Sequence, residues 1–335
     1  MITDARALRP SYLPADLHHR DGKIDQLADA LRPITDGDIG EDAFIFGPSG
    51  TGKTTLAKYV VRKLEQEALD LRWGYVNCMS GSSKNDVLHG LVRDAGLGAD
   101  LRKEGTSTTK FLDRLREFDD QVVAILDEVD VLEDESTLHS LYDLPNLTLV
   151  LITIDEDDLF AHFDGRLRSR FMGSEMVRLE RYRHEELCDI LRARIKAGLA
   201  PGVIDERTVE YIADIAAGDA RVGIAILRRA TKRIMNEDES WISLDVVDSV
   251  QDEAREEIHQ HHVDDLGTHK RLLYEIVEAA GEIGVTELHE TYEQRAPEPK
   301  AKSTRRRYLA SLESKYNLIA SSGNGKGKSY TVPDF

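Results

Sequence analysis

The sequence contains little cysteine and no long apolar segment. Its two cysteines, Cys78 and Cys188, lie far apart among 335 residues and form no CxxC pattern, which argues against a disulfide framework and against a zinc site. No run of eighteen apolar residues occurs, and the first six residues lack the apolar stretch of a signal peptide. We therefore expect a cytoplasmic protein in which both cysteines fill buried apolar positions.

Positive charge is also scarce over the chain as a whole. Lys and Arg number 44 against 62 Asp and Glu, and the net charge of -18 by itself argues against a nucleic-acid partner. The balance reverses between residues 295 and 328, where nine basic and two acidic residues occur. If the protein contacts nucleic acid, we expect it to do so with this C-terminal segment.

Residues 47–54 read GPSGTGKT and match the phosphate-loop pattern GxxxxGK[ST] at every fixed position. Apolar residues precede the loop at 43–46 and follow it at helical spacing. Glycines let the backbone turn so that its N–H groups face phosphate oxygens at the start of a helix, and an ordinary glycine-rich turn is the disfavoured alternative. Lys53 is expected to meet the β and γ phosphates of a nucleoside triphosphate, and Thr54 to ligate Mg²⁺. The residues expected to cradle the nucleotide are Gly47, Pro48, Ser49, Gly50, Thr51, Gly52, Lys53 and Thr54.

Apolar runs in the first half of the chain predict a parallel sheet. Helices separate them, and strands buried on both faces are typical of an α/β fold with a covered sheet. The runs lie at 43–46, 73–78, 122–126 and 147–152. Beyond about Glu175 the strand pattern stops, and helices dominate as far as about His262.

The last seventy residues follow a different pattern. After the acidic pair Asp264-Asp265 and Gly267, apolar spacing predicts three helices and then a hairpin, which is a winged-helix pattern. We therefore divide the chain into a phosphate-loop core (1–174), a helical domain (175–265) and a winged-helix domain (266–335).

The strand at 122–126 ends in Asp127, Glu128, Val129 and Asp130, at the edge of the sheet where the phosphate loop also lies. Asp127 is expected to hold Mg²⁺, directly or through water. Glu128 is expected to polarise the water that attacks the γ-phosphate. A surface turn after a strand is the alternative, and it is disfavoured because the phosphate loop is present.

Two arginines could stabilise the charge that develops in phosphoryl transfer. Arg170 follows the fourth predicted strand, and Arg221 opens a helix after Gly218-Asp219-Ala220. Judged by sequence spacing alone, each of these two arginines is more typical of an ordinary charged residue on the surface.

Five segments in this order carry a family resemblance: GPSGTGKT, LDEVD, SRFMG, Glu180-Arg181-Tyr182, and GDAR followed by Arg228-Arg229-Ala230. Together they resemble the archaeal Orc/Cdc-type replication initiators of the AAA+ origin-recognition family. The resemblance extends over nearly the whole chain, from Tyr12-Leu13-Pro14 to the winged-helix pattern. It implies an AAA+ ATPase core, a helical lid domain and a C-terminal winged helix that binds DNA.

The resemblance also implies residue roles. Tyr12 and Pro14 match the segment against the adenine, and Arg20 matches a basic residue just after it. Thr55 and Tyr182 join the nucleotide-binding set. Arg221 corresponds to a lid arginine at the γ-phosphate, and Arg170 to a finger that reaches a neighbouring subunit's nucleotide. The segment Gly98–Thr109 matches the place of a DNA-contacting element.

One position departs from the family pattern. An asparagine usually ends the fourth strand and orients the hydrolytic water, whereas this chain has Ile154 there, between Thr153 and Asp155. An alkyl side chain donates no hydrogen bond. Either neighbour could substitute after a shift of one residue, so we expect ATP binding with slow or absent hydrolysis.

The basic C-terminal segment is the candidate DNA interface. Arg305, Arg306 and Arg307 begin the third predicted helix, and Lys326 and Lys328 occupy the predicted hairpin tip. In helix-turn-helix proteins such a helix enters the major groove while nearby basic groups contact phosphates. A solvated basic face is the alternative.

These features predict an ATP-switched initiator that binds double-stranded origin DNA. The resemblance implies that it helps to load the replicative MCM helicase and assembles with like or related initiators on DNA. A winged-helix ATPase that regulates transcription is the second hypothesis. A clamp-loader component is the third, and the basic C-terminal segment argues against it.

Overall fold

The computed structural model describes residues 2–68, 70–237, 239–314, 316–323 and 327–333, with the backbone alone at residues 158, 161, 162 and 265. The chain divides into two compact units, Met1–Gln251 and Asp252–Phe335. No helix within the described ranges is long and apolar enough to cross a membrane. Both cysteines are free and buried, as predicted.

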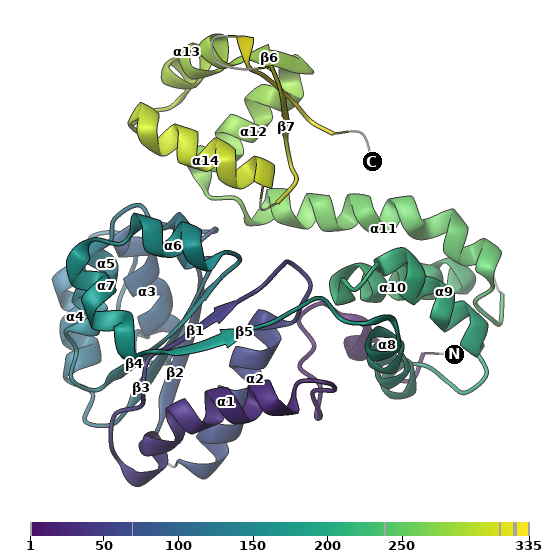
Figure 1. Ribbon diagram of the computed structural model, residues 1–335, viewed down its shortest axis with the longest axis horizontal. Coiled ribbons are helices and arrows are strands. Elements are labelled where there is room, and N and C mark those ends of the chain that lie inside the picture. Colours follow the sequence, from purple (N-terminus) through teal and green to yellow (C-terminus); the bar gives the residue numbers. More distant parts are fainter. Residues whose placement is uncertain (1, 69, 238, 315, 324–326, 334–335) are drawn as a thin grey trace. The chain divides into compact units, whose positions relative to one another are not determined.

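A parallel sheet forms the centre of the first unit (Figure 1). Among the described residues it has five strands in the order β2-β3-β4-β1-β5. They are β1 (Ala43–Phe46), β2 (Arg72–Asn77), β3 (Val122–Asp127), β4 (Leu147–Thr153) and β5 (Glu175–Arg178). Phe46 lies opposite Thr153, and Asp127 lies opposite Ile152. The carboxyl ends of β1, β3 and β4 therefore meet at one edge.

Helices cover both faces of this sheet. Because successive strand residues point to opposite faces, Phe44 and Phe46 join one apolar core and Ile45 joins the other. The helices α1 (Asp21–Leu31) and α2 (Lys53–Glu67) pack on the Ile45 side. The other side is covered by α3 (Lys84–Asp94), α4 (Thr108–Arg116), α5 (Ser136–Tyr142), α6 (Glu156–His162) and α7 (Gly165–Arg170).

The expectation that the strand pattern stops at about Glu175 needs a correction, because strand β5 begins at that residue. Strand β5 pairs with β1 in parallel, with Ala43 opposite Glu175, and it forms an edge of the core sheet. It has four residues, of which only Val177 is buried, so it lacks the continuous apolar run of a central strand. A core limit at residue 174 would separate this strand from its sheet, and the three domain limits stay predictions.

Three helices follow the sheet within the first unit and pack on one another: α8 (His184–Gly198), α9 (Glu206–Ala216) and α10 (Ala220–Asn236). Asp205 caps α9 by accepting from the Thr208 amide, and Asp219 caps α10 by accepting from the Arg221 and Val222 amides. The short helix η1 (Ala5–Leu8) packs against α8 and α10. Helix α11 (Leu244–Asp265) contributes residues to both units.

The second unit contains helices and a small antiparallel sheet. Its elements after α11 are α12 (Thr268–Ala280), β6 (Glu282–Gly284), α13 (Val285–Arg295), α14 (Lys302–Ser314), β7 (Ala320–Ser322) and β8 (Ser329–Thr331). The strand order is β6-β8-β7. Tyr292, Tyr308 and Leu309 are fully buried within this unit. This order of elements is compatible with the predicted winged helix.

Candidate nucleotide site and nucleic-acid interface

The phosphate loop connects β1 to the first residue of α2, Lys53. Gly47, Gly50 and Gly52 have φ of 146°, 75° and 87°, a region that favours glycine. A Cβ on Gly47 would lie 2.3 Å from the Leu179 carbonyl oxygen. The loop is therefore built for glycine by both its backbone angles and its neighbours. Thr51 is buried with its hydroxyl donating to the Pro48 carbonyl at 2.8 Å, while Ser49, Thr54 and Thr55 are half-buried.

Lys53 is buried within the loop, with 7% of its surface exposed. Its Nζ donates to the carbonyl oxygens of Gly47 at 2.7 Å and Pro48 at 3.0 Å. Burial lowers the pKa of Lys53, and the nearby negative charges of Glu128 and Asp127 partly oppose that decrease. The amine is thus desolvated at the place where the sequence predicts phosphates.

Asp127 ends β3 opposite the start of α2. Its Oδ2 accepts from Thr54 Oγ1 at 2.5 Å and from the Tyr75 hydroxyl at 3.1 Å, and its Oδ1 accepts from the Glu128 amide at 3.0 Å. The structure therefore brings together the two predicted Mg²⁺ ligands, Thr54 and Asp127. Carboxylate and hydroxyl oxygens are ligands that Mg²⁺ prefers, so this pair fits the ion. Sequence reasoning missed Tyr75, which belongs to no motif.

The turn after β3 holds the remaining acidic residues. Glu128 has φ of 55°, so its backbone turns sharply just beyond Asp127. Asp130 accepts from the Thr153 hydroxyl at 2.5 Å, which ties the turn to the end of β4. Ile154 follows β4, and its carbonyl oxygen accepts from the Gly47 amide at 3.3 Å. Ile154 therefore lies at the entrance of the phosphate loop, and slow hydrolysis stays a prediction.

The start of α10 lies directly against the phosphate loop. The Ala220 amide donates to the Gly50 carbonyl at 3.1 Å, and a Cβ on Gly50 would lie 1.9 Å from Asp219 Oδ1. Arg221 follows in the first turn of α10, near enough for its charge to add to the effect of burial in lowering the pKa of Lys53. The predicted lid arginine and the loop lysine are thus neighbours.

Arg20 and Tyr182 form a buried support beside the loop. The guanidinium carbon of Arg20 lies 4.0 Å from the centre of the Tyr182 ring. Arg20 Nη2 donates to the carbonyl oxygens of Thr51 at 3.2 Å and Glu180 at 2.9 Å. A Cβ on Gly52 would lie 2.7 Å from the Tyr182 hydroxyl. These two predicted residues therefore hold the backbone of the loop and of the segment after β5.

Tyr12 and Pro14 are half-buried, and Tyr12 is held by helix α8. The Arg194 guanidinium lies 4.8 Å from the centre of the Tyr12 ring and donates to the Tyr12 carbonyl at 3.2 Å and the Ala7 carbonyl at 2.8 Å. Arg194 is 8% exposed, and burial lowers its pKa. Sequence reasoning missed this residue, because an arginine within a helix gives no motif.

Arg170, the predicted finger, is the last residue of α7. Its Nη2 lies 2.7 Å from Asp143 Oδ1, and its guanidinium carbon lies 4.5 Å from the centre of the Tyr142 ring. The side chain is thus held at the end of α5. Contact with a neighbouring subunit stays a prediction.

The prediction that Arg305 contacts DNA needs a correction. Arg305 is 3% exposed, and its guanidinium donates to the His289 carbonyl at 3.0 Å and pairs with Glu293 Oε1 at 2.5 Å. It lies on the same face of α14 as buried Tyr308 and Leu309, so it faces the interior and is not available for a groove contact.

The other basic candidates lie nearer the surface. Arg306 is exposed, whereas Arg307 and Lys328 are half-buried. Lys328 lies 3.5 Å from Glu313 Oε2 and 4.8 Å from the centre of the Tyr330 ring. Lys326 lies outside the described residues. Arg306 is therefore the predicted residue best placed to meet a partner.

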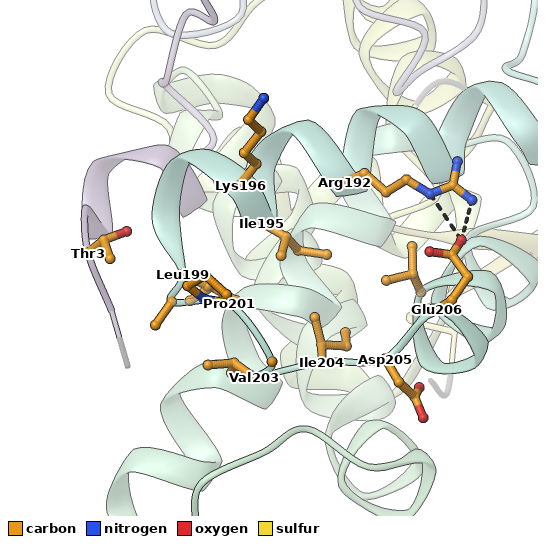
Figure 2. A pocket seen from close by; sticks show the side chains of 13 residues that line it. Thr3, Arg192, Ile195, Lys196, Leu199, Pro201, Val203, Ile204, Asp205 and Glu206 are labelled. Carbon is orange, nitrogen blue, oxygen red and sulfur yellow. Dashed lines mark hydrogen bonds and ion pairs between the residues drawn. The ribbon is translucent and has the colours of Figure 1, made fainter.

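A pocket of about 540 Å³ opens in the first unit between Thr3, the C-terminal half of α8 and the start of α9 (Figure 2). Apolar side chains such as Ile195, Leu199 and Ile204 line it, and the Arg192–Glu206 ion pair lies at its rim. No predicted site residue lines this pocket. It is therefore separate from the phosphate-loop site.

Two family models match this chain, one over the sheet core and one over the helical segment that follows it. The family model described as AAA domain matches residues 43–160, and the model described as Cdc6 AAA+ ATPase-type lid domain matches residues 188–264. Among solved structures, the Aeropyrum pernix ORC1 protein in complex with DNA has a TM-score of 0.75 at 24% identity, with 99% of this chain and 93% of that chain covered. The fold and the loop thus define an AAA+ ATPase with a Cdc6-type lid.

Two sequence relatives extend over the whole chain. ORC1-type DNA replication protein 9 of Halobacterium salinarum is 38% identical over 335 residues, which is 100% of this chain and 94% of that protein. ORC1-type DNA replication protein 1 of the same organism is 41% identical over 303 residues, which is 90% of this chain and 98% of that protein. The chain belongs to the family of ORC1-type DNA replication proteins, which confirms the resemblance stated from its motifs.

Proposed function

We propose that this protein is an archaeal replication initiator that binds ATP with Mg²⁺ and, in that state, binds duplex DNA at a replication origin. The observation that carries the proposal is the convergence of three segments at one point. The phosphate loop, the end of β3 with Asp127, and the start of α10 with Arg221 all meet around Lys53. A ligand that touches all three segments would link the sheet to the lid helices.

The chemistry of these residues fits a magnesium triphosphate. Among the described residues no side chain caps the first turn of α2, so its amides can face phosphate oxygens. Bound Mg²⁺ would supply neutralisation of phosphate charge. Glu128 would orient and polarise the attacking water, and Arg221 would stabilise charge on the γ-phosphate. We propose slow turnover because Ile154 offers no side-chain donor to that water.

The DNA contact is assigned to the second unit. Exposed Arg306 at the start of α14 and half-buried Lys328 beside β8 provide positive charge in an otherwise acidic chain. The fold relative from Aeropyrum pernix was solved with DNA, and a second protein of that organism, ORC2, was solved in ADPNP-ADP complexes. These relatives support the proposal that the chain binds both nucleotide and DNA. That the chain also helps to load the replicative MCM helicase is a further part of the proposal, implied by the family resemblance alone.

The test combines chromosome-wide mapping of binding sites with binding of purified protein to the mapped duplexes. We expect a few origin sites, and duplex affinity that differs at least about tenfold between ATP and no nucleotide. Lys53→Met should bind the duplex as wild type does without nucleotide. A map dominated by promoters would favour the transcription regulator instead. Equal affinity with and without ATP would remove the switch from the proposal.

A further inference from the structure

Tyr75 is a polar residue of the ATPase core with no role in the phosphate-loop motifs. It lies on β2, the edge strand next to β3, directly opposite Ile125. Its ring packs on the same side of the sheet as α2. Asp127 lies two residues further along β3, a distance of roughly 7 Å that a phenol side chain covers. The Tyr75 hydroxyl thereby reaches Asp127 Oδ2 at 3.1 Å.

The same carboxylate oxygen also accepts from Thr54. Asp127 Oδ2 thus receives two hydroxyl donors, and Oδ1 receives the Glu128 amide. A phenol carries its proton at neutral pH and an ionised carboxylate can only accept, so the Tyr75 hydroxyl is the donor in this contact. The three donors fix the rotation of the carboxylate and leave it aligned with the Thr54 hydroxyl.

Tyr75 is itself held on two sides. Lys58 on α2 places its Nζ 3.2 Å from the centre of the Tyr75 ring. The Tyr75 amide, which points outward from the edge strand, donates to Asp94 Oδ2 at the end of α3 at 2.7 Å. A cation over the ring face and a carboxylate on the amide restrict the movement of the phenol. Its hydroxyl is therefore positioned before any ion binds.

We propose that Tyr75 is a positioning residue of the Mg²⁺ site, which orients Asp127 so that the ion binds together with the nucleotide at low concentration. This inference rests on the proposed function, because it takes Asp127 and Thr54 as the magnesium groups. Residues that orient metal ligands typically change metal affinity 10- to 100-fold when they are removed. Tyr75 would act in this way through Asp127, without touching the nucleotide.

The experiment measures ATP affinity of the full-length protein against Mg²⁺ concentration and in EDTA, by calorimetry or a fluorescent ATP analogue. For Tyr75→Phe we expect the Mg²⁺ concentration at half-maximal effect to rise about tenfold, with unchanged affinity in EDTA. Lys58→Met keeps the phenol but removes the cation. It should raise the Mg²⁺ concentration at half-maximal effect about threefold.

Tyr59→Phe is the matched control. Tyr59 lies on α2, packs against the same core, and has Lys63 at 5.7 Å from its ring centre. It should keep the wild-type Mg²⁺ midpoint. A Tyr75→Phe midpoint equal to that of wild type overturns the inference. If Tyr75→Phe does not fold, as judged by circular dichroism, the Lys58→Met titration decides, and an unchanged midpoint there overturns it.

Asp127→Asn separates the two levels of the proposal. If wild type and Asp127→Asn bind ATP equally at every Mg²⁺ concentration, the assignment of the magnesium site fails. If they differ as expected while Tyr75→Phe behaves as wild type, only the role of Tyr75 fails.

Discussion

Buried cations occur both at the phosphate loop and in the C-terminal unit, and their partners differ. Lys53 donates to the Gly47 and Pro48 carbonyls, whereas Arg305 donates to the His289 carbonyl and also pairs with the Glu293 carboxylate. Backbone carbonyls satisfy the hydrogen bonds of a cation without neutralising its charge, which at Lys53 is offset in part by the nearby negative charges of Glu128 and Asp127. A carboxylate compensates the charge as well. The first arrangement suits an anion-binding site, and the second stabilises the fold.

This difference implies opposite responses to removal of the charge. Substitution of Lys53 by an apolar residue removes a desolvated amine from the protein without nucleotide. Substitution of Arg305 removes a guanidinium whose contacts join α13 and α14. Ligand binding should therefore fail in the first case and folding in the second.

The largest effect is expected for Lys53→Met. Loss of the buried amine should weaken ATP binding more than about 100-fold, because a charge-assisted contact to phosphate is lost inside a desolvated site. Without nucleotide the variant should be at least as stable as wild type, since burial lowers the pKa of Lys53. Calorimetry of ATP binding and thermal unfolding measure the two effects. Lys63→Met, on the exposed side of the same helix, is the control and should bind ATP normally.

Glu128→Gln should reduce ATP turnover at least about 100-fold while ATP binding stays within a few-fold of wild type. The amide keeps the size of the side chain but cannot polarise water as a carboxylate does. Single-turnover hydrolysis and retention of radiolabelled ATP measure the effect. Equal turnover would show that Glu128 does not act on the water.

The third prediction compares two adjacent arginines of α14. Arg305→Met should destabilise the C-terminal unit by about 2 kcal/mol, because the buried His289 carbonyl loses its donor, whereas the exposed Glu293 carboxylate can be hydrated. Arg306→Met should leave the stability within about 0.5 kcal/mol and reduce the salt dependence of duplex binding by about one counterion. Denaturant unfolding and salt titrations measure the pair. If Arg306→Met unfolds the unit and Arg305→Met does not, the assignment of faces on α14 is wrong.

The smallest effect concerns Asp42, a half-buried carboxylate just before β1 whose Oδ1 accepts from the Leu149 amide. Burial raises its pKa to about 6, while the Leu149 amide partly opposes the increase. Because the folded state prefers the protonated form, this group costs stability as the pH rises from about 4 through about 6. The free energy of unfolding of Asp42→Asn should therefore rise by about 1 kcal/mol relative to that of wild type when the pH changes from 5 to 8. Urea unfolding at both values checks the sign, and a loss at pH 8 would contradict it.

The phosphate loop and the end of β3 were predictable because a ligand fixes their chemistry. A triphosphate with Mg²⁺ requires glycines, a lysine, a hydroxyl and a carboxylate at set spacings, and Lys53, Thr54 and Asp127 meet around that requirement. The central strands were predictable for a related reason, since burial on both faces demands unbroken apolar runs. Strand β5 lies at an edge and carries no such run.

Supporting residues were beyond the reach of motif reasoning. Tyr75 and Arg194 act through neighbours that are distant in the sequence, and any single polar residue in a strand or helix could do the same. Arg305 is different, because a usable signal existed. It shares helical spacing with Tyr308, Leu309 and Leu312, which places it on the apolar face of α14. A count of positive charges omits that spacing, and so it placed a structural arginine on the surface.

The contact between Arg194 and the carbonyls of Ala7 and Tyr12 joins residues that are 187 and 182 positions apart. During synthesis the segment that contains Ala7 and Tyr12 therefore has no binding site until α8 has been translated. At typical elongation rates this takes roughly 10 to 40 seconds. The N-terminal segment therefore takes its final place only after α8 has been made. In a chain truncated before Arg194, the N-terminal segment would lack this binding site. We expect such products to be cleaved readily by proteases.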